Sequence, residues 1–136
     1  MLELKGKIIR VDLTTGKINV FETEHFYNFL GGRGYGDWVA LKEIPKNTEP
    51  LSEGNKVVIS TGCFTGTSLP GSSRISLTTK NVLSGGISYS SGGGNFGPEL
   101  KKAGFDAIII EGKALSPKYL YINDSNIELR DASHLW

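Results

Sequence analysis

The glycine-rich stretch Gly85–Gly104 constrains the possible fold of this chain more than any other feature. It reads GGISYSSGGGNFGPELKKAG and holds seven of the eighteen glycines in a chain of 136 residues. This glycine content is nearly double the average usage of about 7%. Glycine lets the backbone adopt positive φ and lets other groups approach it closely, so the composition favours turns and sheets over a helical bundle.

The stretch divides into a polar strand-like piece, a glycine loop and a short helix. Pro98 suits the first position of that helix, and Gly104 suits the position just past its end. Unpaired N–H groups converge where a glycine loop enters a helix, which makes the loop a candidate anion site. A tight turn with no ligand explains the same pattern, and the loop alone does not separate the two interpretations.

The loop also matches the dinucleotide-binding pattern G-x-G-x-x-G at Gly92, Gly94 and Gly97, with Glu111 about twenty residues further on. Three observations weigh against that fold. The helix after Pro98 is too short to cross over a sheet, the preceding piece is polar, and no alternating βαβ pattern comes before it. We therefore do not predict a dinucleotide fold.

The remaining chain predicts one α+β domain over residues 1–136, mostly antiparallel sheet with hairpins and a few short helices. Residues 105–111, FDAIIIE, are strongly apolar and are expected to form a central strand. The predicted strands are 5–13, 18–20, 56–60, 74–79, 87–91, 105–111, 119–122 and 127–129, and the predicted helices are 23–30, 35–43 and 98–103.

Composition excludes several classes of function. The formal net charge of +1 lacks the strong basic field of a nucleic-acid binder. No apolar run approaches the roughly 20 residues of a membrane span, and no signal peptide is evident, so we expect a cytoplasmic protein. Cys63 is the single cysteine, which excludes an internal disulfide or a cysteine-rich cluster. His25 and His134 have no ligand spacing, and we assign no catalytic residue to this chain.

Two loops rich in hydroxyl groups and glycine, residues 61–73 and 84–95, flank Arg74. If adjacent strands carry these loops, they meet at one end of a sheet. Arg74 would then offer its planar fork of donors to a phosphate or a carbonyl group. This pattern predicts a large anionic ligand with many acceptor atoms.

Many collinear blocks resemble the N-terminal domain of the tungsten-containing aldehyde ferredoxin oxidoreductases. The match covers essentially the whole chain, and its specificity lies in the order and spacing of the blocks. They are GKIIRVDLTTGKI, FLGGRGYG, PLSEGNKVVISTG, TGT, the Arg74 strand with TTK, SGGGNFGPELKKAGFDAIIIEGKA, PKYLYI and IELRDASHLW.

The resemblance implies a domain of two β-sheets that forms a base for a tungsten or molybdenum bis-pterin cofactor with a bridging magnesium ion. It implies that Arg74 hydrogen-bonds the cofactor. It also implies that the loop beside the pterin and its phosphate–magnesium unit consists of Ser91, Gly92, Gly93, Gly94 and Asn95. The chain departs from the family at Ser91, where the best-known members have asparagine, and at Cys63, where we expect proline.

The family's 4Fe-4S cluster and its proposed acid–base residues lie in later domains. The resemblance therefore implies a partner, either the remainder of the oxidoreductase or a separately encoded subunit, with ferredoxin as the electron acceptor. We expect this chain alone to be inactive in aldehyde oxidation. Leu135 and Trp136 are apolar residues that would favour self-association if exposed, so the sequence leaves a homo-oligomer as one alternative.

Two other functions use the same glycine loop. One is a stand-alone module that binds a phosphate or nucleotide ligand. The other is a scaffold paralogue that kept the sheet and lost the cofactor, for which Ser91 would be an early sign.

Overall fold

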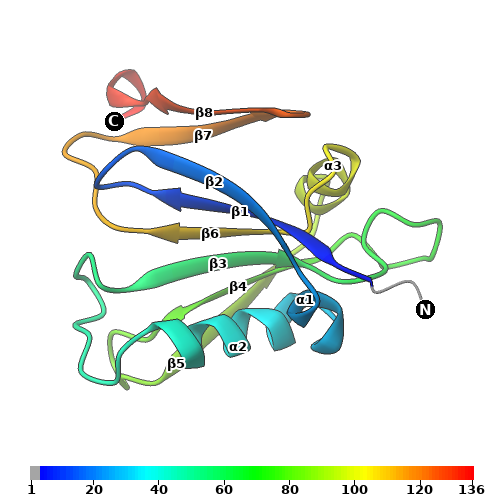
Figure 1. Cartoon of the computed structure of the whole chain (residues 1–136), viewed down its shortest axis with the longest axis horizontal. Helices are drawn as coiled ribbons and strands as arrows, with labels where there is room; N and C mark the ends of the chain where they lie inside the picture. The colour runs from blue at the N-terminus through cyan, green and yellow to red at the C-terminus, as the bar shows by residue number, and fades with distance from the viewer. Residues whose placement is uncertain (1–3) are drawn as a thin grey trace.

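The computed structural model describes residues 4–136, which form a central sheet with structure packed on both faces (Figure 1). The strands are β1 (Gly6–Asp12), β2 (Lys17–Thr23), β3 (Lys56–Thr61), β4 (Ile75–Lys80), β5 (Ile87–Gly92), β6 (Ala107–Glu111), β7 (Lys118–Asn123) and β8 (Asn126–Asp131). The helices are α1 (His25–Asn28), α2 (Gly32–Glu43), α3 (Phe96–Lys102) and the short 3-10 helix η1 (Ser133–Leu135). Within residues 4–136, no helix is long and apolar enough to cross a membrane.

Six strands form the large sheet in the order β2-β1-β6-β3-β4-β5, and β7 pairs with β8 in a separate two-stranded sheet. The β1–β6 pair is parallel, and the other neighbouring pairs are antiparallel. The predicted α+β class, with two mostly antiparallel sheets, hairpins and short helices, is confirmed.

Strand β6 lies in the middle of the large sheet, as its apolar sequence predicted. It pairs with β1 on one side and β3 on the other, and Ile108 and Ile109 are buried on opposite faces. A strand covered on both faces can be apolar at every position, which explains why FDAIIIE does not alternate.

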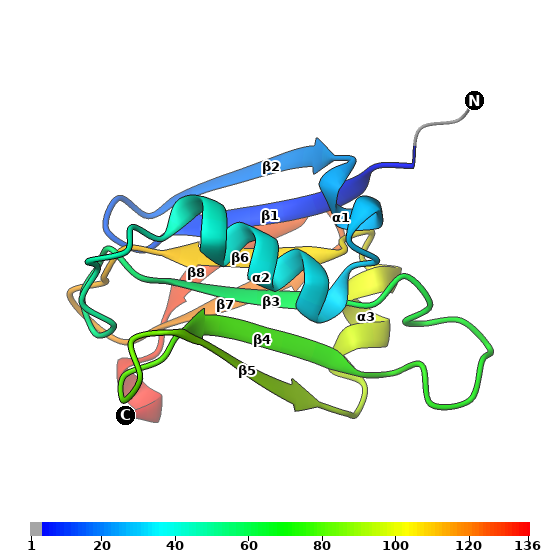
Figure 2. The same ribbon diagram turned by 90° about the horizontal axis from the view of Figure 1, so that it is seen from below.

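Helices α1 and α2 cover one face of the sheet (Figure 2). Glycine allows α2 to pack closely there, because a side-chain carbon at Gly36 would lie 2.4 Å from Thr78 Oγ1 of β4. The core beneath these helices consists of Ile8, Phe26, Tyr35, Val39, Val58, Ala107 and Ile109.

Helix α3 and the β7–β8 hairpin cover the other face, chiefly over β1 and β6 (Figure 1). Helix α3 ends in a Schellman motif, in which Gly104 has φ of 90° and the N–H of Phe105 bonds the carbonyl of Leu100. Gly104 therefore has the predicted place past the helix end. The buried residues of this second core are Ile9, Val11, Leu100, Phe105 and Ile108.

The connection from β5 through α3 to β6 differs from a dinucleotide-binding unit. β5 is an edge strand that pairs with β4, and the chain of antiparallel pairs places β5 antiparallel to β6. The edge position also explains the polar sequence of β5. Helix α3 begins at Phe96, two residues before the predicted start, so Pro98 lies inside its first turn.

Candidate functional site

Arg74 and Ser91 lie side by side at one end of the large sheet. Arg74 immediately precedes β4, and the register pairs Ser76 of β4 with Ser91 of β5. The Nη1 of Arg74 donates a hydrogen bond of 3.3 Å to Ser91 Oγ. Both side chains are exposed, and within residues 4–136 Arg74 takes part in no ion pair. The guanidinium therefore keeps most of its donors for a ligand.

The backbone at Arg74 is fixed by contacts beneath it. Thr65 Oγ1 donates to the carbonyl of Arg74 at 3.3 Å and accepts the N–H of Gly62 at 2.9 Å. Gly97 of α3 packs so closely that an added side-chain carbon would lie 3.0 Å from Ile75, from Thr65 and from the carbonyl of Ser73. Gly97, the last glycine of the G-x-G-x-x-G pattern, thus packs α3 against the base of the site.

The loop from Ser91 to Asn95 connects β5 to α3 across this end of the sheet. Side-chain carbons added at Gly93 or Gly94 would meet no atom within 4 Å, and Gly94 has φ of 101°. Asn95 occupies the N-cap position of α3, yet its side chain makes no capping hydrogen bond. The loop therefore presents bare backbone and one free amide group to the outside.

A hollow of about 370 Å³ opens beside Arg74 in the loop between β3 and β4. Leu30, Cys63 and Phe64 contribute to its wall. The side chain of Cys63 is half-buried here. The full lining is Leu30, Gly62, Cys63, Phe64, Thr65, Gly71, Ser72 and Arg74.

The first turn of α2 also lies at this end of the sheet, a position that the sequence did not predict. We expected that helix to begin at Tyr35, but it begins at Gly32. A side-chain carbon at Gly32 would lie 3.6 Å from Ser76 Oγ, the register partner of Ser91. Figure 2 shows α1, the start of α2, the β3–β4 loop and α3 gathered at this end. The signal in the sequence was the run Gly31-Gly32-Arg33-Gly34, which we interpreted as a connection.

Only part of the predicted second loop lies in this region. Residues 91–95 lie beside Arg74, but Ser84, Gly85 and Gly86 lie in the β4–β5 turn, at the opposite end of both strands. The expectation that the whole segment 84–95 gathers around Arg74 is therefore wrong, because β5 runs through the middle of the segment.

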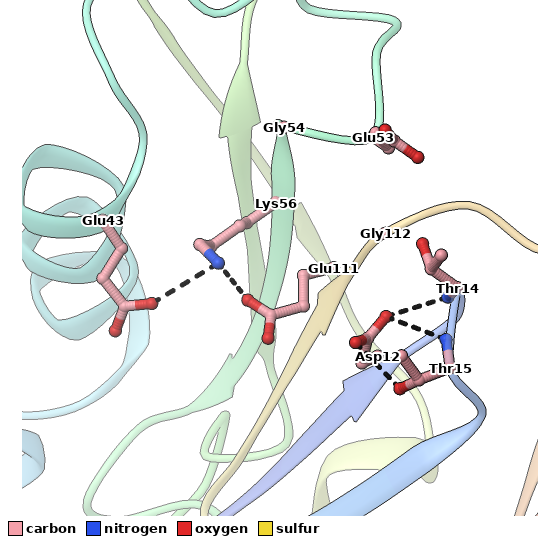
Figure 3. A pocket seen from close by; sticks show the side chains of 9 residues that line it. All are labelled: Asp12, Thr14, Thr15, Glu43, Glu53, Gly54, Lys56, Glu111 and Gly112. Carbon is pink, nitrogen blue, oxygen red and sulfur yellow. Dashed lines mark hydrogen bonds and ion pairs between the residues drawn. The ribbon is translucent and has the colours of Figure 1, made fainter.

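A second pocket, of about 380 Å³, lies at the opposite end of the large sheet and is lined by charged side chains (Figure 3). Arg10 binds Glu43 through two hydrogen bonds of 2.7 Å and reaches Glu111 at 3.1 Å. Lys56 pairs with Glu111 and lies 3.7 Å from Glu43. These four residues, the Arg10–Glu43–Lys56–Glu111 network, join α2 to β1, β3 and β6.

Burial alone would raise the pKa of Glu43, but the hydrogen bonds and charges of Arg10 and Lys56 outweigh it and hold that pKa below its ordinary value. The hydrogen bond to Glu43 is the main reason that the pKa of Arg10 is raised. On the other side of the pocket, Asp12 Oδ1 accepts the N–H of Thr14 at 2.8 Å, which closes the β1–β2 turn. Since each of these charges serves the fold, we interpret this pocket as structural.

Within residues 4–136, no group of three or more His, Cys, Asp and Glu side chains could hold a metal ion. The ring of His25 lies 4.2 Å from that of Trp38, where it packs in an aromatic cluster at the start of α2. The end of the sheet at Arg74 is therefore the candidate site, and its donors suit an anionic ligand rather than a bare metal.

Comparison with known proteins gives a single answer for the family. The family model described as "Aldehyde ferredoxin oxidoreductase, N-terminal domain" matches residues 8–136. The tungsten-containing aldehyde ferredoxin oxidoreductase of Pyrococcus furiosus is 48% identical over 96% of this chain, and that match covers 22% of the relative. The aliphatic sulfonate oxidoreductase, WOR-like subunit, of the same organism is 40% identical over the whole chain and 22% of the relative.

A solved structure shares both fold and sequence with this chain. It is the active site complex BamBC of benzoyl coenzyme A reductase, solved with 1,5-dienoyl-CoA. The TM-score is 0.92 at 36% identity, over 97% of this chain and 21% of the other. The chain thus spans about a fifth of the length of the proteins that it matches.

Proposed function

The chain belongs to the aldehyde ferredoxin oxidoreductase family, and we propose that it is the domain that binds one side of a tungsten or molybdenum bis-pterin cofactor. The observation that carries the proposal is Arg74 on Ser91, next to the open backbone of Gly93 and Gly94. The aldehyde ferredoxin oxidoreductase of Pyrococcus furiosus is tungsten-containing, which favours a metal–pterin ligand over a nucleotide at this site.

The residues present fit such a group. A pterin carrying a phosphate needs donors for its oxygen atoms and a surface without side chains where its ring system lies. Arg74 provides unpaired donors, and a side-chain carbon added at Gly93 or Gly94 would project into open space. Asn95 has a free amide for a further hydrogen bond. Ser91 would serve the site by holding Arg74, a role that a hydroxyl group can fill.

The metal–pterin group supplies the redox chemistry when it is bound. This chain's own residues would bind and orient it: Arg74 fixes its anionic end, and the loop from Gly92 to Asn95 supports it from below. For the parent protein we propose oxidation of an aldehyde with water to a carboxylic acid, with electrons passing through a 4Fe-4S cluster to ferredoxin. Cluster, substrate pocket and acid–base residues would come from the remainder of the protein or from a partner subunit.

The names of the relatives cover an aldehyde, an aliphatic sulfonate and an aromatic coenzyme A thioester. Proteins with different substrates thus share this domain. We therefore assign cofactor binding to this chain and assign it no substrate.

The experiment is to replace Arg74 in the native protein and to measure bound tungsten by elemental analysis and pterin by fluorescence after denaturation. Loss of charge-assisted hydrogen bonds costs roughly 1.5–3 kcal/mol, so we expect Arg74→Ala to lower cofactor affinity about tenfold or more. Arg74→Lys keeps the charge but loses the planar fork of donors, so its cofactor affinity should lie between those of Arg74→Ala and the unsubstituted protein. Full occupancy in Arg74→Ala would remove Arg74 from the site.

A further inference from the structure

A second arginine, Arg33, is held in a fixed position near Arg74. It lies in the first turn of α2, and its Nε bonds Asp37 Oδ2 at 3.1 Å. Its guanidinium carbon lies 4.8 Å from the centre of the Tyr89 ring on β5. The side chain is nonetheless 63% exposed. Asp37 and Tyr89 therefore fix the guanidinium while its outer nitrogens stay accessible to a ligand.

The strand register brings Arg33 and Arg74 to the same face of the sheet. Tyr89 pairs with Thr78, and Ser91 pairs with Ser76, so both pairs lie on the face that α2 covers. Alternate residues of a strand are about 7 Å apart on one face. Arg33 stacks on Tyr89 and Arg74 bonds Ser91, so the residues that anchor the two guanidinium groups lie one such step apart on β5.

The local electrostatics leave this region positive. A helix N-terminus carries a partial positive charge, so an arginine in the first turn of α2 is unfavourable without a nearby anion. Asp37 is the one carboxylate that forms an ion pair with either arginine within residues 4–136. Two arginines, one carboxylate and the helix terminus therefore add up to a site for an anion.

We propose that Arg33 and Arg74 together bind one phosphate group, and that it is the phosphate-bearing end of the cofactor. This inference rests on the proposed function. Asp37 and Tyr89 are positioning residues that hold Arg33 toward that group. A free diphosphate shares the same chemistry, so the test must separate the two sources.

The test compares Arg33→Ala with a matched control, Arg130→Ala. Arg130 is a half-buried arginine that also stacks on a tyrosine, 3.6 Å from the centre of the Tyr121 ring, and it bonds Glu128 at 2.8 Å. It lies on β8, in the separate two-stranded sheet. Each substitution thus removes one positive charge, one stacking contact with a tyrosine and one ion pair. Arg33→Ala does so at the site, and Arg130→Ala does so away from it.

Two quantities are measured in full-length protein. The first is tungsten and pterin content of the native protein, and the second is the dissociation constant for inorganic pyrophosphate in protein produced without tungsten, by isothermal titration calorimetry. We expect Arg33→Ala to lower cofactor content and to raise the dissociation constant about tenfold, while Arg130→Ala changes neither. Arg33→Lys, which keeps the charge alone, should recover part of both.

The outcomes separate the ideas. If Arg33→Ala weakens pyrophosphate binding but leaves cofactor content intact, the site serves free phosphate and the assignment to the cofactor is overturned. If neither quantity changes, Arg33 is a surface residue and the inference fails, whatever Arg74→Ala does. If the unsubstituted protein holds no pterin, the proposed function itself fails, independently of Arg33.

Discussion

Some glycines in this chain are required by close packing in the fold, and others lie where a side chain would meet no neighbouring atom. Gly36 faces Thr78 at a distance that no side-chain carbon tolerates, and Gly97 is enclosed by Ile75 and Thr65. Gly93 has open space around it, and its backbone does not demand glycine. Space beside Gly93 is what a ligand resting on the loop would need. The fold explains the first group, and the proposed cofactor explains the second.

The contrast predicts opposite effects on stability. Alanine normally favours a helix over glycine by about 1 kcal/mol, but the clash with Thr78 should make Gly36→Ala a net loss of about 1–2 kcal/mol. Gly93→Ala should change stability by less than about 0.5 kcal/mol. Urea unfolding of the two variants beside the unsubstituted chain measures both values. Equal stabilities would mean that α2 does not pack on β4 as closely as described.

At the scale of elements, α2 is held at its two ends by different means. Its first turn packs against Ser76 through Gly32, and its last residue, Glu43, is bound into the Arg10–Glu43–Lys56–Glu111 network. The network crosses from the helix to three strands at the end of the sheet opposite Arg74. Figure 3 shows the part in which Lys56 joins Glu43 to Glu111. The network thus ties the last residue of α2, the helix whose first turn carries Arg33, to the sheet.

Because of this network, the free energy of unfolding should decrease at acidic pH. Because the folded state lowers the pKa of Glu43 below 4.5, its contribution is present above that pH and is lost as pH falls through the folded pKa. Glu43→Gln should cost about 2 kcal/mol at pH 7 and should flatten the loss of stability between pH 5 and 3 (roughly). Urea unfolding across that range is the measurement. A variant that keeps the full pH dependence would assign it to other carboxylates.

Local sequence patterns predicted most elements but not how they pair. Alternating residues indicated the β1–β2 hairpin, the turn residues 123–126 indicated the β7–β8 hairpin, and the apolar run indicated β6. The parallel pairing of β1 with β6 joins residues about a hundred positions apart, and no local signal reports such a contact. The start of α2 was also missed, since three consecutive residues with positive φ, Leu30, Gly31 and Gly32, allow the chain to enter the helix directly after a tight turn.

At the scale of the whole molecule, strand register assembles the candidate site. Arg74 could be associated with the glycine loop from sequence, because both flank predicted strands that are neighbours along the chain. The sequence could not show which residues of segment 84–95 lie beside Arg74. Strand β5 runs through this segment and places Ser84 and Ser91 at opposite ends of the sheet. Arg33 could not be predicted as a site residue for a related reason, because its place beside Tyr89 depends on how α2 packs over the sheet.

The two ends of the large sheet therefore differ in whether their polar groups are already paired. At the charged end, Arg10, Glu43, Lys56 and Glu111 satisfy one another in ion pairs, while the end at Arg74 leaves donors and bare backbone exposed. Exposed apolar side chains surround the second end, including Leu30 and Phe64 beside the hollow. An anionic ligand covered by the rest of a longer protein would satisfy both the donors and the apolar rim.

We propose that this end of the sheet forms one wall of a metal–pterin site, and the cofactor content of the native protein is the measurement that decides it. The protein should be isolated from cells supplied with tungstate and molybdate, then analysed for both metals and, after denaturation, for pterin fluorescence. We predict that the protein holds tungsten or molybdenum together with its bis-pterin. Folded protein that carries neither metal nor pterin would contradict it and would leave a phosphate-binding module or a cofactor-free scaffold in its place.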